Sequence, residues 1–285
     1  MPASDQGTAG PREPEWLDLC RQAAGRLRQV LLELPTTHER AVDAGRGEGG
    51  DRSLVIDQAA EEGVFALLDR LHRAGRRFTA ASEERGWVDY GDPGVLVMID
   101  PIDGSLNAKR DLSPYAISIA VADGRTMADV AFAFVHDYGA EEEWTAWRGG
   151  GATLNGRPLA GDAGERRDRT GRLEIVGIES ADPRWVAESI QDLLGQAHRL
   201  RALGSIAVSL CQVAAARMDA MLSLKRCRAF DAAAGQLIVR EAGGHVAFTK
   251  FEPPLGAPLD LEPHSPVVAA RSARALDELA SIPRA

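Results

Sequence analysis

Cysteine is scarce in this chain of 285 residues. The three cysteines, Cys20, Cys211 and Cys227, lie far apart and form no Cys-x-x-Cys pair. An odd and sparse set of this kind indicates reduced thiols in an intracellular protein, where they serve as packing residues. No group of His or Cys has the spacing of a zinc site, so a metal site in this chain is expected to use oxygen ligands.

Long hydrophobic runs and an excess of positive charge are also missing. No apolar run reaches about 18 residues, which predicts that no helix spans a membrane, and residues 1–14 lack the apolar segment of a signal peptide. A cytoplasmic protein without a membrane partner is the resulting expectation. The net charge of −9, without a long basic face, argues against a nucleic-acid partner. Hydrophobic residues make up 45% of the chain, which indicates a globular protein with a large core.

Residues 14–160 are expected to form an N-terminal half. Residues 1–13, rich in Pro, Gly and charge, predict a disordered tail, and apolar residues at helical spacing predict a helix over 15–34. The Gly-rich, charged residues 41–52 predict a mobile surface loop, and no Gly-Lys-(Ser/Thr) follows to make them a phosphate-binding P-loop. A second helical pattern begins near Asp57, which the local sequence alone explains as a helix cap.

Strand patterns dominate the remainder of that half. They cover residues 78–82, 95–99, 115–122, 128–136 and 143–147. The pair Asn155-Gly156 is a strong hairpin signal, so an antiparallel sheet is expected. A polar loop at 161–171 marks the boundary, and residues 172–285 alternate strands and helices as a C-terminal α/β half. We expect the active site between the two halves.

The most informative stretch covers residues 94–107. Residues 95–99 form a short apolar run that predicts a buried strand. Pro101 cannot donate a hydrogen bond to a sheet, so the strand is expected to end there in a turn. Gly104 allows a tight bend, and Ser105 is expected to cap a short helix. The stretch therefore predicts a rigid turn at a strand end.

Two carboxylates, Asp100 and Asp103, lie on this turn beside free backbone N–H groups. Carboxylates suit a hard cation such as Mg²⁺, and N–H groups suit phosphate. Taken alone, Asp-x-x-Asp is more often a solvated turn. The sequence Asp-Pro-Ile-Asp-Gly-Ser, however, resembles the metal-binding motif of the inositol monophosphatase family, Asp-Pro-(Ile/Leu)-Asp-Gly-Thr.

Further motifs resemble the same family in the same order along the chain. Ser-Glu-Glu-x-Gly contains Glu83, and Phe-Asp-Ala-Ala-Ala-Gly contains Asp231, with Phe where the family usually has Trp. The segment around Asp57 resembles the one whose Asp holds a water at the border of the metal site. Each acid also has a simpler explanation, a solvated turn for Glu83 and a helix cap at the start of its helix for Asp231. The resemblance covers roughly residues 15–270.

The resemblance implies a role for each matching residue. One metal would be held by Glu83, Asp100 and the backbone carbonyl of Ile102, and a second by Asp100, Asp103 and Asp231. The catalytic residues would be Asp57, Ser105 and Glu83, with Ser105 and Asp57 orienting the attacking water and taking its proton. The substrate-binding residues would be Asp103, Gly104, Ser105, Gly204, Ser205 and Arg228.

Electrostatics gives an independent reason to expect metal. A cluster of acids in one cleft is unfavourable unless cations neutralise it, because each charge raises the pKa of its neighbours. It would also repel a phosphate. Two or three Mg²⁺ ions, or Mn²⁺ in their place, would neutralise the cluster and attract the substrate. The resemblance implies lithium inhibition as well.

The identity of the substrate is less constrained. Inositol-specific family members carry a Glu seven residues before the third-motif Asp, and this chain has Leu224 there. The basic residues Lys225, Arg226 and Arg228 are either a solvated turn or a contact for a second phosphate. The expected function is hydrolysis of a small sugar or cyclitol phosphate. Alternatives are a fructose-1,6-bisphosphatase or a 3′(2′),5′-bisphosphate nucleotidase.

A different class of function is a catalytically inactive pseudophosphatase that binds phosphorylated sugars. Such a protein would bind these ligands without releasing phosphate. The resemblance implies an α+β fold, a layered α/β/α/β/α sandwich of the sugar phosphatase type, and frequent assembly as a homodimer. A small phosphorylated metabolite is the expected partner.

Overall fold

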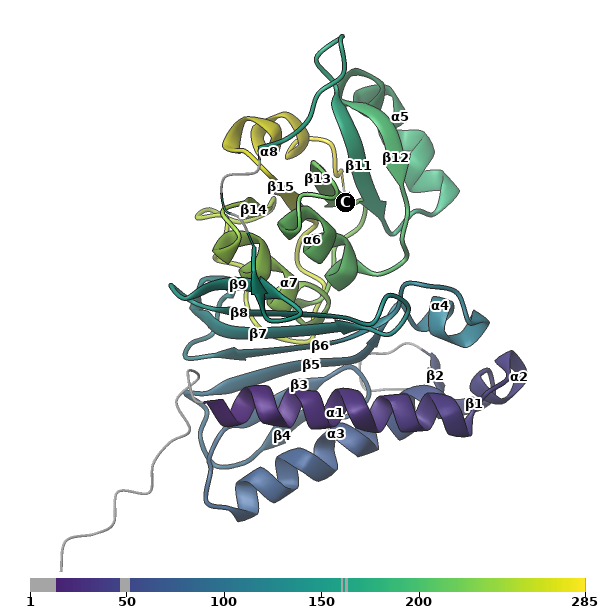
Figure 1. Cartoon of the computed structure of the whole chain (residues 1–285), viewed down its shortest axis with the longest axis vertical. Coiled ribbons are helices and arrows are strands. Elements are labelled where there is room, and N and C mark those ends of the chain that lie inside the picture. The colour runs from purple at the N-terminus through teal and green to yellow at the C-terminus, as the bar shows by residue number, and fades with distance from the viewer. Residues whose placement is uncertain (1–13, 47–51, 160, 162–163, 285) are drawn as a thin grey trace, which may run out of the picture.

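The computed structural model describes residues 14–46, 52–159, 161 and 164–284 (Figure 1). The expected tail at 1–13 and the middle of the expected loop at 41–52 lie outside these residues. Within the described part of the chain, no helix combines the length and apolar character needed to cross a membrane. All three cysteines are buried free thiols.

An eight-stranded sheet forms one layer, with strand order β10-β9-β8-β7-β6-β5-β3-β4. Its strands are β3 (Thr79–Ser82), β4 (Gly86–Asp89), β5 (Leu96–Asp103), β6 (Ala116–Ala122), β7 (Val130–Asp137), β8 (Glu142–Trp147), β9 (Gly151–Leu154) and β10 (Arg157–Pro158). Strands β3 and β5 are parallel, and the other neighbours are antiparallel. Strands β5 and β6 are buried throughout, which explains the apolar residues of the first half of β5 and of most of β6.

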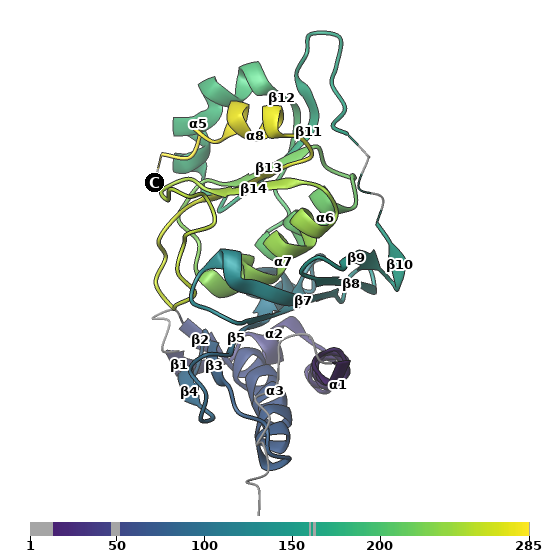
Figure 2. The same ribbon diagram turned by 90° about the vertical axis from the view of Figure 1, so that its left-hand side faces the viewer.

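Two long helices, α1 (Pro14–Glu33) and α3 (Val55–Arg73), cover the outer face of this sheet (Figure 2). Each has an apolar face at helical spacing that packs into the same core cluster. The shorter elements of this half are α2 (Thr37–Arg40), β1 (Asp43–Arg46), β2 (Arg52–Leu54), α4 (Ser105–Arg110) and the 3₁₀ turn η1 (Met127–Asp129). Helix α4 directly follows β5, which places it at the sheet end where the acids lie.

A five-stranded sheet forms a second layer, with strand order β12-β11-β13-β15-β14. Its strands are β11 (Leu173–Glu179), β12 (Ala197–Arg201), β13 (Ala220–Ser223), β14 (His245–Phe248) and β15 (Val267–Ala270). Strand β11 runs parallel to both β12 and β13, while β15 is antiparallel to β13 and β14. The helices of this half are α5 (Pro183–Gln196), α6 (Ile206–Ala214), α7 (Ala229–Glu241) and α8 (Ala273–Leu279).

Helices α6 and α7 lie between the two sheets, and α5 and α8 cover the outer face of the five-stranded sheet (Figure 2). One apolar cluster includes Met98 of the first sheet, Leu237 of α7 and Val267 of the second sheet. Small residues bring α6 and α7 together: a Cβ on Gly235 would lie 2.7 Å from the Leu210 Cβ. The predicted layered α/β/α/β/α sandwich is confirmed.

The prediction of a mobile surface loop at 41–52 missed two short strands near its ends. Strands β1 and β2 pair in an antiparallel hairpin, with Asp43 opposite Leu54 and Arg46 opposite Arg52. The backbone groups of these residues therefore hydrogen-bond to one another. Glycine-rich composition does not prevent this pairing, since a ladder needs only backbone groups.

The prediction that the strand ends at Pro101 is also wrong, because β5 continues to Asp103. Pairing with β3 ends at Ile99, and pairing with β6 is irregular between Asp100 and Asp103. Pro101 thus lies where its missing N–H removes no ladder bond.

Two helix starts differ from the predictions. Gly104, with φ +88°, is the N-cap of α4, and Ser105 is its first helical residue. Helix α7 begins at Ala229, so Asp231 is its third residue. The Asp231 Oδ2 accepts a hydrogen bond from the backbone N–H of Arg228 at 2.9 Å. The acid satisfies a helix-terminal donor from inside the first turn.

Candidate active site

A cavity of about 780 Å³ opens where the end of β5 and α4 face β11, the loop before α6 and the start of α7. The predicted site residues that line it are Glu83, Asp100, Ile102, Asp103, Gly104, Ser105, Gly204, Ser205, Arg228 and Asp231. Asp57 is buried in the first turn of α3 but does not belong to the lining. The fold thus brings the motif residues of both halves to one cavity.

Asp100 lies near the end of β5 and is only 3% exposed. Its Oδ1 accepts a hydrogen bond from the backbone N–H of Ile102 at 3.0 Å. Burial raises the pKa of Asp100 well above its usual range, and the negative charges of Asp103, Glu83 and Asp231 raise it further. The carboxylates of the motifs therefore lie within each other's electrostatic field.

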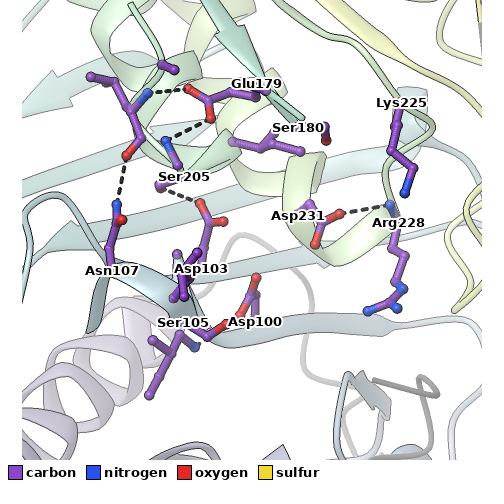
Figure 3. A pocket seen from close by; sticks show the side chains of 18 of the residues that line it. Asp100, Asp103, Ser105, Asn107, Glu179, Ser180, Ser205, Lys225, Arg228 and Asp231 are labelled. Carbon is purple, nitrogen blue, oxygen red and sulfur yellow. Dashed lines mark hydrogen bonds between the residues drawn. The ribbon is translucent and has the colours of Figure 1, made fainter. Parts of the chain in front are cut away.

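Asp103 faces the N-terminal end of α6 (Figure 3). Its Oδ2 accepts hydrogen bonds from the Ser205 Oγ at 2.5 Å and from the Ala207 backbone N–H at 2.7 Å. Burial raises the pKa of Asp103 to about 6, and these hydrogen bonds oppose that rise. Asp103 is thus a direct link between the two halves.

The turn after Asp103 is packed closely. A Cβ on Gly104 would lie 3.0 Å from the Gly204 carbonyl oxygen and 3.2 Å from the Pro114 carbonyl oxygen. The positive φ of Gly104 and this close approach both require glycine. Ser105 follows on the exposed side of the turn and belongs to the cavity lining.

An ion pair crosses the cavity between the halves. The Arg228 Nη1 lies 2.6 Å from the Glu83 Oε1. Burial raises the pKa of Asp231 to about 8, the charges of Asp103 and Glu83 add to the rise, and Arg228 opposes it. Arg228 therefore contacts one predicted metal ligand with its side chain and another with its backbone.

Sequence reasoning missed Glu179 at the end of β11. This buried carboxylate accepts hydrogen bonds from the backbone N–H groups of Leu203 and Gly204 and from the Ser209 hydroxyl. Burial raises the pKa of Glu179 to about 7. Its partners lie 24 to 30 positions further along the chain, so no local sequence pattern marks it. The Asn107 amide was likewise missed, and it bridges the Pro114 and Leu203 carbonyls.

The residues considered for substrate choice are distributed around the cavity. Lys225 and Arg226 belong to its lining. Leu224 is only 2% exposed and packs in the apolar cluster of the C-terminal half. The cavity therefore has a basic side and no acid at position 224.

The donor chemistry fits a hard divalent cation. The acids at the cavity are oxygen donors whose pKa values are raised by burial and mutual repulsion, which a bound cation would relieve. Asp100 and Asp231 point toward a common space, whereas Asp103 turns toward Ser205 (Figure 3). Within the described residues, no three His, Cys, Asp or Glu side chains already converge as a metal-ligand group.

The raised pKa values predict that stability falls as pH rises. Burial raises the pKa values of Asp103, Glu179 and Asp231 to about 6, 7 and 8, whereas Asp and Glu in the unfolded chain have pKa values near 4. Between these limits the folded state binds more protons, so the free energy of unfolding decreases with pH. With a chelator present, we expect the thermal midpoint to fall by several degrees from about pH 5 to about pH 8.

Asp231→Asn should reduce this pH dependence, since the amide does not titrate, whereas Asp103 and Glu179 still do. Calorimetry at a series of pH values measures both proteins. A midpoint of the unmodified protein that rises steadily across the same range would contradict the expectation.

Comparison with known proteins gives a consistent result. The family model for the inositol monophosphatase family matches residues 15–283. A fructose-1,6-bisphosphatase/inositol-1-monophosphatase from Methanothermobacter thermautotrophicus is 31% identical over 242 residues, covering 81% of this chain and 83% of the relative. Nus factor SuhB from Escherichia coli is 35% identical over 235 residues, which cover 81% of this chain and 84% of the relative. The solved structure of extragenic suppressor protein SuhB from Bartonella henselae has a TM-score of 0.75 at 23% identity, covering 93% of this chain and 98% of that one, and shows the shared fold.

Proposed function

The chain belongs to the inositol monophosphatase family, and from this premise we propose that it is a Mg²⁺-dependent phosphomonoesterase acting on a small sugar or cyclitol phosphate. The observation that carries the proposal is the meeting of Glu83, Asp100, Asp103 and Asp231 at one cavity beside the Gly104 turn. Acids from both halves at one site suit cations that in turn bind a phosphate.

Glu83, Asp100, Asp103, Asp231 and the Ile102 carbonyl would hold two or three Mg²⁺ ions, with Mn²⁺ as a substitute. Bound cations of this kind supply positive charge to the phosphate oxygens and lower the pKa of water.

The remaining roles fall to polar groups of the chain itself. The N–H groups of Gly104 and Ser105 would donate to phosphate oxygens. The Ser105 hydroxyl and the Asp57 carboxylate would orient the attacking water and accept its proton. Gly204 and Ser205 would form the opposite wall against the substrate.

The substrate class is supported by the basic side of the cavity. The Methanothermobacter relative is named for both fructose 1,6-bisphosphate and inositol 1-phosphate hydrolysis. Lys225 and Arg226 line the same cavity as the acids, which suits a second anionic group. A sugar bisphosphate or a 3′(2′),5′-bisphosphate nucleotide is therefore the alternative substrate. A catalytically inactive pseudophosphatase that binds phosphorylated sugars is the other alternative.

A substrate panel tests the proposal. Phosphate release would be measured with saturating Mg²⁺ from inositol 1-phosphate, fructose 1,6-bisphosphate, phosphoadenosine phosphate and a sugar monophosphate. A preferred substrate identifies the class, and loss of activity with a chelator supports metal dependence. Binding without release from any ester would favour the pseudophosphatase alternative.

Arg228→Ala should separate two roles of one side chain. If Arg228 contacts a second phosphate, kcat/KM for fructose 1,6-bisphosphate should fall by about tenfold and that for a monophosphate by less. Because Arg228 also pairs with Glu83, the Mg²⁺ concentration at half-maximal activity should change for both substrates alike. Steady-state kinetics over a range of Mg²⁺ concentrations measures both effects.

Arg274→Ala is the matched control, since that side chain is 71% exposed and pairs with Glu278 on α8. Equal losses for bisphosphate and monophosphate in Arg228→Ala would remove this residue from recognition of a second phosphate.

Assembly as a homodimer, lithium inhibition and a cytoplasmic location belong to the same proposal. Light scattering of the purified protein tests the dimer, and phosphate release at increasing Li⁺ tests the inhibition. We expect a dimer by light scattering and a decrease in phosphate release as the Li⁺ concentration rises.

A further inference from the structure

Glu179 is a buried acid that none of the predicted roles uses. Its side chain is 2% exposed and lies in the cavity wall at the end of β11. The Oε1 accepts hydrogen bonds from the Leu203 N–H at 3.0 Å and from the Ser209 Oγ at 2.5 Å, and the Oε2 accepts one from the Gly204 N–H at 2.9 Å. These three donors are neutral, so the carboxylate is held by hydrogen bonds from the loop before α6 and from α6 itself.

The segment that Glu179 holds is the one that contacts the motif turn. The Leu203 carbonyl accepts a hydrogen bond from the Asn107 Nδ2 at 2.7 Å. The Ser205 Oγ donates to the Asp103 Oδ2 at 2.5 Å. Figure 3 shows this chain of contacts leading from Glu179 through the loop to Asn107 and Asp103.

The choice of an acid at this position is unfavourable for stability alone. A buried carboxylate loses its hydration, and the charge of Asp103 adds repulsion. A neutral residue would avoid both the loss of hydration and the repulsion. A carboxylate, however, offers one oxygen to the N–H of Leu203 and the Ser209 hydroxyl and a second oxygen to the N–H of Gly204, whereas an amide would present an NH₂ group in place of one of these oxygens.

We propose that Glu179 is a positioning residue of the site, which fixes the loop Leu203–Ser205 and through it the orientation of Asp103. The role for Asp103 in phosphate ester hydrolysis rests on the proposed function, whereas the contacts that carry the inference do not. The hydrogen bonds of the Glu179 side chain go to Leu203, Gly204 and Ser209, none of which is a predicted metal ligand.

Glu179→Gln tests the proposal, because the amide keeps the size of the side chain but replaces one acceptor oxygen with a donor. We expect kcat to fall on the order of tenfold with a smaller change in KM, since Asp103 is displaced rather than removed. The backbone amides of Gly204 and Ala207 should exchange faster with solvent. Glu174→Gln, the same change at a half-exposed position of the same strand, should alter neither quantity.

A double-mutant cycle with Ser205→Ala isolates the route of the effect. If Glu179 acts through the Ser205–Asp103 hydrogen bond, Glu179→Gln should lower kcat by a clearly smaller factor in the Ser205→Ala background than in the unmodified protein. Additive losses would overturn the proposal. So would a Glu179→Gln variant with a lower thermal midpoint but unchanged kcat and unchanged amide exchange.

Ser209→Ala provides a second test if Glu179→Gln does not fold. It removes one of the three hydrogen bonds to the carboxylate and should produce the same changes to a smaller extent, and unchanged exchange at Gly204 would overturn the proposal. Hydrogen exchange needs no substrate. A chain that hydrolyses no phosphate ester would therefore refute the proposed function, while the exchange result would still decide the positioning role.

Discussion

Asp100→Asn should abolish phosphate release, lowering kcat by roughly a thousandfold or more. Asp100 is the acid whose pKa is raised by the charges of Asp103, Glu83 and Asp231 together, so it lies at the centre of the acidic cluster. An amide oxygen binds a divalent cation more weakly than a carboxylate does, and the substitution removes the charge that would be shared between two cations. Phosphate release and Mg²⁺ titration calorimetry measure the two losses.

Although Asp100→Asn should abolish activity, it should increase the stability of the metal-free protein. With a chelator present, removing one charge from a buried like-charged cluster should raise the thermal midpoint above that of the unmodified protein. Added Mg²⁺ should then raise the midpoint of the variant less than that of the unmodified protein. Asp89→Asn, at an exposed position on β4, is the control and should leave all three quantities unchanged. Activity near the unmodified level in Asp100→Asn would refute its role as a metal ligand.

Gly104→Ala should lower both stability and activity by large amounts. The φ of +88° disfavours any side chain, and the new Cβ would lie 3.0 Å from the Gly204 carbonyl oxygen. The conformational part costs about 1–2 kcal/mol. The contact forces the turn to move away from the Leu203–Ser205 loop, and a displacement of the reacting groups by a fraction of an ångström to 1 Å can lower kcat by about a hundredfold.

Gly149→Ala separates the two causes. Gly149 has φ +72°, and no atom lies within 4 Å of the position of an added Cβ. This control therefore carries the conformational penalty without the contact. Thermal denaturation and steady-state kinetics of both variants separate the effect of the positive φ from the effect of the contact. Equal losses of activity would show that the close contact between Gly104 and Gly204 is not needed to position the residues of the site.

The acids of the site were predictable because each belongs to a short motif. Glu83, Asp100, Asp103 and Asp231 carry recognisable neighbours within a few residues, and the fold brings all four to one cavity. The order of layers was predictable for a related reason, since alternating strand and helix patterns and the family resemblance agree. These features depend on residues close together in sequence.

Features that depend on distant pairing were not predictable in this way. No local motif marks Glu179, and only its partners in the loop before α6 give it a role. Pro101 was predicted to end the strand, yet β5 continues because neither neighbouring strand pairs with it at that position, so its missing N–H breaks no ladder bond. The hairpin of β1 and β2 depends on backbone pairing that composition does not encode. Asp57 is a motif residue outside the cavity lining, so its role stays a prediction.

The helices between the two sheets, α6 and α7, decide whether the protein can be divided into working fragments. Helices α6 and α7 belong to the C-terminal half of the sequence, yet they share an apolar cluster with strands of both sheets. A fragment ending between β10 and β11 would leave one face of the eight-stranded sheet bare and prone to aggregation. Neither half is therefore expected to work alone, and a nascent chain presents all four acids of the cavity to cellular cations only after α7, which carries Asp231, has docked.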